Sequence, residues 1–291
     1  MQGYNLSCQI AFKAKSPSLD LCSYLAVKDT KMTRSQLSSS VPASNEAPAY
    51  SGNTARKDNW WLEPAMVAIA FTAFGIYATW RAFENQYFEI GPYLSPFYSP
   101  LVQVPGMPSW FSPALWILPF PLAFRATCYY YRKAYYRAYF STPPACTVGI
   151  FKGKGYTGEY AFPFVLQNLH RYAFYLAVPV LGILWFDALK TLYYDGGMHL
   201  SILTLVMLYN VILLSGYTFG CHAFRHLVGG NLDCFSCKDG TLKPAFKMWH
   251  NVTKLNERHM QWAWTSLFTV AATDLYIRFT AINPSLDFKL F

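Results

Sequence analysis

Charged side chains are scarce in this sequence. Only 13% of its 291 residues are Asp, Glu, Lys or Arg, whereas a soluble domain carries about 25%. Apolar residues make up 53% and aromatic residues 19%. This balance excludes an ordinary soluble domain and predicts a membrane protein. The net charge of +9 lies in loops between apolar segments, so it predicts topology signals and contacts to membrane lipids rather than a nucleic-acid partner.

An apolar signal core is absent from the first 57 residues, which are rich in Ser, Ala and Lys. We predict that residues 1–57 form a disordered extension, with Met32 as an alternative start. Cysteine is present in an odd number, seven. In a chain without a secretory signal, this number argues against an extracellular disulfide framework, and we expect reduced or metal-bound thiols.

The sequence contains long apolar runs. Five segments are each long enough to cross a hydrocarbon core of about 30 Å as a helix. They run from Trp60 to Phe83, Phe111 to Tyr131, Phe164 to Leu189, Leu200 to Leu227 and Met260 to Ala281. We therefore predict an all-α membrane protein, a bundle of five transmembrane helices within residues 58–283, followed by a short outer tail at 284–291.

Proline and basic residues refine this topology. Three prolines at 113, 119 and 121 predict a kink or an irregular start in the second span, and five more between Glu89 and Pro113 exclude a regular helix there. The second-to-third and fourth-to-fifth connections are rich in Lys and Arg, and the other two are poor in them. Because cytoplasmic loops retain Lys and Arg, we predict the N-terminus inside and the C-terminus outside. The stretch Tyr129 to Tyr139 should be a helix outside the membrane, whose aromatic and basic side chains suit headgroups or a docked soluble partner.

This topology brings histidines and cysteines from four helices to one layer at the inner face. His222 and His226 are four residues apart, so they share one face of a helix. Ionisable residues in membrane helices are costly and usually face a functional interior, although a single histidine at a helix end often only bonds a carbonyl or a headgroup. The predicted layer contains Cys128, His170, Cys221, His222, His226 and His259, with Arg125, Arg171, Arg225 and Arg258 beside them.

Three kinds of centre could use these residues. Two histidines could hold a b-type haem, and two histidines with two thiolates could hold a Rieske-type [2Fe–2S] cluster. Zinc is the third alternative, with Cys234, Cys237 and His250 as a separate candidate site in the inner loop. Cys128 and Cys221 favour the cluster, because a haem would leave both thiols without a role.

Ionisable residues also occur at the outer ends of the spans, as a set balanced in sign: Arg81, Glu84, Asp187, Asp274 and Arg278. We predict that they pair between helices and fix the bundle. A proton route to a quinone is the alternative use of the same groups.

Four stretches resemble the single-subunit, five-helix membrane anchor of a class of succinate dehydrogenase that reduces menaquinone. They are Arg125 to Arg137 (RATCYYYRKAYYR), Gln167 to Tyr172 (QNLHRY), Cys221 to His226 (CHAFRH) and Leu255 to Trp264 (LNERHMQWAW). The resemblance extends over about Trp60 to Ala281, and the first 50 or so residues have no counterpart in it.

The resemblance implies a multi-pass subunit of the inner (cytoplasmic) membrane, with a flavoprotein and an iron–sulfur subunit docked on the inner face. Electrons from succinate would pass through these partners to menaquinone, and this chain would hold no succinate site of its own. The resemblance also implies a Rieske-type cluster, onto which the six histidines and cysteines of the inner layer map as candidate ligands. Arg258 and Trp262 are the nearest candidates for contacts to the quinone. The alternatives are a haem b anchor of a related respiratory complex and a polytopic transporter, for which the sequence lacks an internal repeat.

Overall fold

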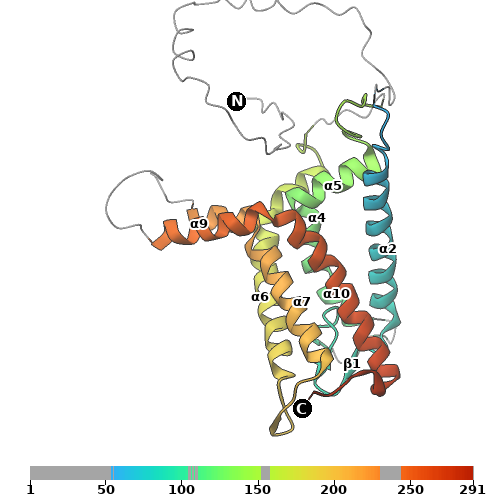
Figure 1. Ribbon diagram of the computed structural model, residues 1–291, viewed down its shortest axis with the longest axis vertical. Helices are drawn as coiled ribbons and strands as arrows, with labels where there is room; N and C mark the ends of the chain where they lie inside the picture. Colours follow the sequence, from blue (N-terminus) through green and yellow to red (C-terminus); the bar gives the residue numbers. More distant parts are fainter. Residues whose placement is uncertain are drawn as a thin grey trace, which may run out of the picture.

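The chain folds into a helical bundle with short elements at both ends (Figure 1). The computed structural model describes residue 54 and residues 56–103, 106, 108, 111–151, 158–229 and 244–290. The helices that run along the bundle are α2 (Leu62–Glu84), α3 (Ala114–Ile117), α4 (Pro119–Thr127), α6 (His170–Lys190), α7 (Ile202–Phe219) and α10 (His259–Ile282). A short 3-10 helix, η1 (Phe164–Leu169), leads into α6.

Within the described residues, three helices are long and apolar enough to cross a membrane. They are α2, the joined stretch Phe164–Lys190, and α7. These agree with the first, third and fourth predicted spans. Of the other two, α10 is long, at 24 residues, but carries Asp274 and Arg278 in its second half. The second, α3 and α4, covers only Ala114–Thr127.

Two predicted boundaries are wrong. In both cases the helix ends before the apolar stretch of the sequence ends. The second span was predicted to continue to Tyr131, but the chain breaks at Cys128, whose ψ of 129° is extended. The fourth was predicted to continue to Leu227, but α7 ends at Phe219. Apolar composition alone does not report these turns, because the residues after each break are again helical and partly apolar.

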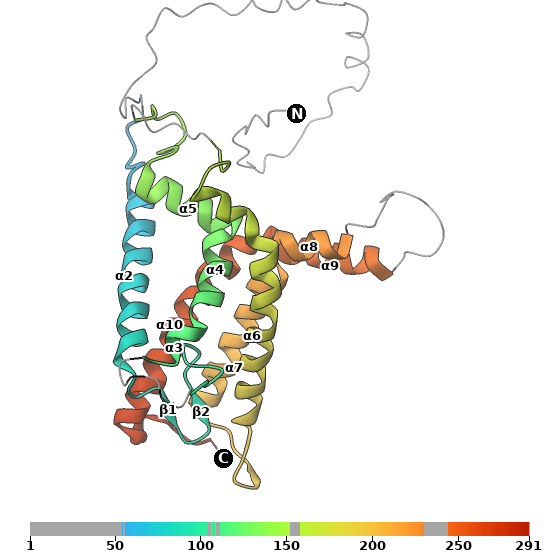
Figure 2. The ribbon, with the colours of Figure 1, turned by 180° about the vertical axis from the view of Figure 1, so that it is seen from behind.

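The chain breaks after α4 and after α7 at the same end of the bundle, and the helices at this end lie across the bundle axis. They are α5 (Tyr129–Phe140), α8 (His222–Gly229) and α9 (Pro244–Glu257), and Figure 2 shows α8 and α9 extending sideways from the bundle. The predicted helix over Tyr129 to Tyr139 is therefore confirmed. It packs beside α2 instead of continuing the line of α4.

The opposite end is closed by two antiparallel hairpins and the C-terminal segment. The first pairs β1 (Glu89–Ile90) with β2 (Tyr93–Leu94), and the second pairs β3 (Tyr193–Tyr194) with β4 (Gly197–Met198). Asp195 and Gly196 both have positive φ, 52° and 75°, as a tight hairpin turn requires. A 3-10 turn, η2 (Pro284–Leu286), precedes a backbone bond from the Leu290 N–H to the Leu200 carbonyl, 2.7 Å. As predicted, no regular helix precedes Pro113 among the described residues of 89–113.

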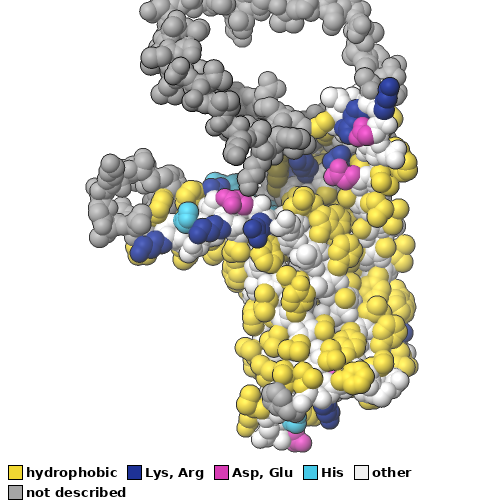
Figure 3. Space-filling view, in the orientation of Figure 1, with side chains coloured by type: hydrophobic (Ala, Val, Ile, Leu, Met, Phe, Trp, Pro, Cys, Tyr) yellow, Lys and Arg dark blue, Asp and Glu magenta, His cyan; other side chains and the backbone are white. Residues whose placement is uncertain are grey.

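The polarity of the bundle is inverted relative to a soluble protein. Large apolar side chains such as Ile69, Ile76 and Phe186 are more than 60% exposed, and the shaft of the bundle is covered by hydrophobic side chains (Figure 3). The buried side chains of the long bundle helices include these polar ones: Arg81, Thr204, Asn210, Thr218, Ser266, Thr273, Asp274 and Thr280. This arrangement suits a lipid environment, where polar groups must find partners inside the protein.

At the hairpin end, four of the five charges predicted to pair do so between helices. The fifth, Asp187 on α6, forms no ion pair with a described cation and accepts a hydrogen bond from the Ser99 hydroxyl. The Arg81 Nε atom lies 2.7 Å from the Asp274 carboxylate, and both side chains are fully buried. The Tyr77 hydroxyl donates to the same carboxylate at 2.5 Å, and the Ser95 hydroxyl is a further donor. Arg278 pairs with Glu84 at 2.5 Å. These bonds tie α2 to α10.

Breaking this pair from one side should destabilise the protein strongly. Arg81→Met leaves the Asp274 charge buried without its cation, so we expect a loss of about 3–5 kcal/mol of stability. The matched control is Arg137→Met, which removes the 3.1 Å pair to the exposed Glu63 and should cost at most about 1 kcal/mol. Thermal unfolding in detergent measures both. The double variant Arg81→Met/Asp274→Leu should lose less than Arg81→Met alone; an equal loss would contradict the ion-pair argument.

Candidate functional site

The predicted site residues lie where helices begin, end or break. His170 is the first residue of α6 and His259 the first of α10. Cys128 occupies the turn between α4 and α5, and its N–H bonds the Arg125 carbonyl at 3.2 Å. Cys221 lies between α7 and α8. All four are therefore at the end of the bundle where α5, α8 and α9 lie across its axis (Figure 1).

Gly220 allows the close packing at the end of α7. A Cβ at Gly220 would lie 2.6 Å from the Gly216 carbonyl oxygen and 3.2 Å from that of Leu255. The end of α7 thus packs directly on the end of α9, and the Asn256 side-chain amide donates to the Gly220 carbonyl at 2.8 Å. This contact turns the chain into α8 and places His222 and His226 on that helix.

A cavity of about 700 Å³ collects most of the predicted donors. Five of the six predicted ligands line it: Cys128, His170, His222, His226 and His259. Its remaining walls include Thr127, Tyr129, Tyr130, Arg132, Gln167, Asn168, Arg171, Asn256 and Glu257. Cys221, Arg258 and Trp262 are not among its lining residues. The convergence of His and Cys on one site is therefore a property of the fold, for five residues of the predicted set.

The donors form close pairs around this cavity. The Nε2 atoms of His222 and His226 are 2.9 Å apart, which confirms that they share a helix face. The Cys128 Sγ atom lies 3.4 Å from His259 Nε2, and His170 Nδ1 lies 2.9 Å from the Thr127 hydroxyl. Among the described residues, no three His, Cys, Asp or Glu side chains stand close enough together to hold a metal ion.

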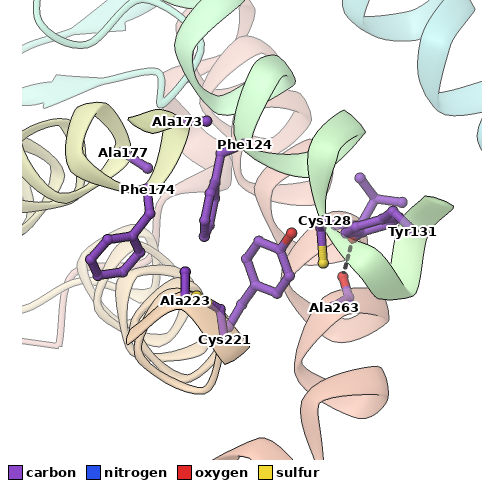
Figure 4. Close-up of a cluster of buried hydrophobic side chains, with 11 residues drawn as sticks. Phe124, Cys128, Tyr131, Ala173, Phe174, Ala177, Cys221, Ala223 and Ala263 are labelled. Atoms are coloured by element: carbon purple, nitrogen blue, oxygen red, sulfur yellow. Dashed lines mark hydrogen bonds between the residues drawn. The ribbon is translucent and has the colours of Figure 1, made fainter. Parts of the chain in front are cut away.

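The two cysteines are packed in one buried cluster, although only Cys128 reaches the cavity. Figure 4 shows Cys128 from the α4–α5 turn and Cys221 from the end of α7 in the same group of side chains, together with Phe124 and Phe174. The Cys221 Sγ atom accepts the Phe224 N–H at 3.4 Å. Both thiols are at most 2% exposed.

Several buried polar atoms near the cavity lack a hydrogen-bond partner within the described part of the chain. They include His259 Nδ1 and Trp262 Nε1. A buried polar atom without a partner costs free energy. These two atoms are therefore candidates for bonding a group that the protein alone does not supply.

The electrostatics of this end are dominated by cations. Arg125 is partly buried, 4.7 Å from the Tyr217 ring centroid and 5.5 Å from that of Tyr131. It bonds the Ser266 hydroxyl at 3.1 Å, and no described carboxylate pairs with it. On α8, partial desolvation lowers the pKa of His222, and the neighbouring His226 and Arg225 lower it further. The His222 imidazole is therefore neutral at neutral pH, the form that binds metals.

Sequence reasoning missed two residues of this site. The Thr127 hydroxyl contacts His170, and Tyr217, which is fully buried, stacks on His259 with ring centroids 5.1 Å apart. Both lie in the last turn of an apolar helix. Thr127 directly precedes Cys128, and Tyr217 is one helical turn before Cys221. That proximity is the signal by which they could have been found. The alternative zinc site at Cys234 and Cys237 lies outside the described residues, and His250 is exposed on α9.

Fold and site together define a helical membrane protein whose polar donors converge at one end of the bundle. Residues 62–283 match the family model of the actinobacterial succinate dehydrogenase subunit SdhC, and the chain belongs to this family. Among solved structures it is similar to a chain of the Mycobacterium smegmatis Sdh1 complex in the apo form, with 40% identity and a TM-score of 0.73. That match covers 82% of this chain and 95% of the other. No curated protein matches the sequence.

Membership of this family establishes the coarser part of the sequence-based prediction: the protein is an SdhC-type membrane subunit of a succinate dehydrogenase complex. Other subunits of that complex are its partners. The resemblance found in the four motif stretches is confirmed at this level.

The close approach of Trp262 to α7 gives a test of the site's packing. A Cβ at Gly216 would lie 2.6 Å from the Trp262 ring, so Gly216→Ala should displace the indole and lower the melting temperature in detergent. The control is Gly182→Ala, where a Cβ meets nothing within 4 Å and the better helix propensity of Ala, about 1 kcal/mol, favours the variant. An equal response of the two variants would show that the Trp262 contact is not tight.

Proposed function

We propose that this subunit carries electrons from the iron–sulfur subunit of a succinate dehydrogenase to menaquinone in the membrane. The flavoprotein and iron–sulfur subunits are the soluble partners, and succinate is oxidised on the flavoprotein and not on this chain. One observation carries the proposal: in a member of the SdhC family, four histidines from α6, α8 and α10, together with Cys128 from the α4–α5 turn, line one cavity at one end of the bundle. Electron transfer needs a chain that holds redox centres close together and tunes them.

The donor chemistry fits a Rieske-type [2Fe–2S] cluster. Such a cluster takes two thiolates and two imidazoles and passes single electrons. Cys128 and Cys221 supply the two thiols, and two of His170, His222, His226 and His259 supply the imidazoles. Around the cavity, the neutral His222 and the buried, unbonded Nδ1 atom of His259 are consistent with this use. No three described donors lie at ligating separations, and Cys221 does not line the cavity. We therefore infer that side chains of the cavity wall and the turn at Cys221 rearrange when the cluster is assembled.

The remaining wall residues would support the ligands and the quinone. Thr127 orients His170 through the 2.9 Å contact to Nδ1, and the Tyr217 ring holds His259 by stacking. Trp262, with its buried and unbonded Nε1 donor, is our candidate for a bond to a quinone oxygen, and Arg258, the residue before α10, is the second candidate.

The proposed membrane arrangement has five spans: α2, α3 with α4, η1 with α6, α7, and α10. We place the cavity end on the cytoplasmic side of the inner membrane. The loops predicted to be cytoplasmic adjoin α5, α8 and α9, and they carry most of the loop Lys and Arg. In this orientation the cavity faces the docked iron–sulfur subunit, and the hairpins and the C-terminus lie outside.

The cluster proposal predicts which thiols matter. In the purified complex, Cys128→Ser and Cys221→Ser should each remove about two iron atoms and the EPR signal of a histidine-ligated [2Fe–2S] cluster, because that cluster needs both thiolates. Two of the four histidine variants, His170→Ala, His222→Ala, His226→Ala and His259→Ala, should do the same.

The exposed Cys146 provides the control, since Cys146→Ser should keep both iron and signal. If both buried-cysteine variants keep their iron while two histidine variants lose a haem absorption band, the site is a haem b site. If none of these variants changes iron content or spectrum, the cavity holds no redox centre.

Arg125 has a defined place in this proposal. It is a partly buried cation without a described carboxylate partner, and it lies in the turn that precedes Cys128. An unpaired charge in a low-dielectric interior is costly. With two thiolates and two neutral imidazoles, such a cluster would be neutral when oxidised and would carry one negative charge when reduced, which Arg125 would offset. We therefore assign Arg125 as a residue that tunes the potential of the centre.

Replacing Arg125 by Gln should lower the midpoint potential of the cluster, because removal of a nearby cation disfavours the more negative reduced state. EPR-monitored redox titration of the complex gives the potential. The control is Arg137→Gln, whose cation already pairs with Glu63. An unchanged potential in Arg125→Gln, with the cluster present, would refute this role and leave the cluster proposal standing.

A further inference from the structure

The helices α8 and α9 form a lateral arm, which we call the interface arm (residues 222–229 and 244–257). It projects sideways from the bundle at the level where α7 ends and α10 begins (Figure 1). The two helices pack on each other through Trp249, whose ring lies 4.8 Å from the Arg225 guanidinium. A Cβ at Gly229 would lie 2.4 Å from the same ring, so only glycine allows this approach. Arg225 also bonds the Thr253 hydroxyl at 3.0 Å. The arm is therefore a packed element.

The second helix of the arm has two distinct faces. At 100° per residue, Met248, Val252 and Leu255 cluster on one side of α9, and Lys247 and Lys254 cluster on a flank about 120° around the helix from them. Val252 is buried, whereas Met248 is 50% exposed. A helix that carries apolar residues along one side and lysines along a flank beside it is the kind that lies in a membrane interface.

The charged side chains of the arm are predominantly basic. Its basic side chains are Arg225, Lys247 and Lys254, and Glu257 at the root is its one acidic residue among those described. None of the three cations forms an ion pair with a described carboxylate. Neither lysine lines the histidine cavity, whereas Glu257 does. The lysines are therefore exposed cations that the proposed electron-transfer site does not use.

The position of the arm relative to the hydrophobic surface indicates that its partner is lipid. In Figure 3 the arm lies beside the upper edge of the hydrophobic surface of the bundle, and basic and histidine side chains are visible along it. In a membrane subunit this edge is the level of the lipid headgroups. A cation there meets phosphate groups of anionic lipids within a Debye length. An apolar side chain next to it meets the acyl boundary.

We propose that the interface arm lies in the membrane plane and binds anionic phospholipid headgroups through Lys247 and Lys254, with Met248 in the acyl boundary. The arm would thus anchor the cavity end of the subunit at a defined depth. This proposal concerns a surface outside the cavity, so it does not depend on which redox centre the cavity holds.

The test uses the complete complex in nanodiscs of phosphatidylcholine with increasing fractions of phosphatidylglycerol. Hydrogen exchange of the amides of 244–257 should slow several-fold as phosphatidylglycerol rises, and native mass spectrometry should detect retained phosphatidylglycerol. The double variant Lys247→Gln/Lys254→Gln should lose both effects. The control Lys190→Gln/Lys289→Gln removes two exposed lysines at the hairpin end and should keep them.

Two results would overturn the proposal. The first is a rate of hydrogen exchange in the wild-type arm that does not change with the fraction of phosphatidylglycerol. This result does not depend on the folding of any variant. The second is a Lys247→Gln/Lys254→Gln variant that loses its soluble subunits while its response to phosphatidylglycerol is unchanged. That outcome would make the arm a protein-docking surface.

Discussion

The buried ion pair between Arg81 and Asp274 sets the register of the first helix of the bundle against the last. Both side chains are fully buried and 2.7 Å apart, so neither α2 nor α10 can slide or rotate without separating two charges in a low-dielectric interior. Asp274 lies 15 residues after His259 on one continuous helix, a distance of about 22 Å along its axis. The pair at the hairpin end thereby fixes the depth at which His259 meets Cys128 at the other end.

The two ends of the bundle treat polar groups differently. At the hairpin end, Asp274 has three side-chain donors and Arg278 pairs with Glu84. At the cavity end, Arg125 has no described carboxylate, and His259 Nδ1 is buried without a partner. The paired charges at the hairpin end hold α2 and α10 together, whereas the polar atoms at the cavity end could bond a group that binds there. Our proposal, made for a member of the SdhC family, is that this group is a redox centre.

Helix ends matter more than helix faces at this site. His170 and His259 begin helices, Cys128 breaks one, and Cys221 follows the end of another. Side chains at such positions can reach a common cavity from helices that run side by side. The same breaks create α5, α8 and α9, which lie across the bundle and present aromatic and basic residues next to the cavity. The site and the surface around it therefore have one structural origin.

The sequence by itself determined the membrane class, three of the spans, the helix at Tyr129 to Tyr139, the pairing of four of the five charges at the hairpin end and the shared face of His222 and His226. Each of these follows from local periodicity or composition. Only the tertiary structure decided that α7 ends at Phe219, because that turn depends on the contact of Gly220 with the Leu255 carbonyl, a residue 35 positions away. It also decided that Cys221 stays in the core while Cys128 reaches the cavity. Which thiol faces a cavity depends on the packing of helices far apart in the chain, and no local pattern encodes it.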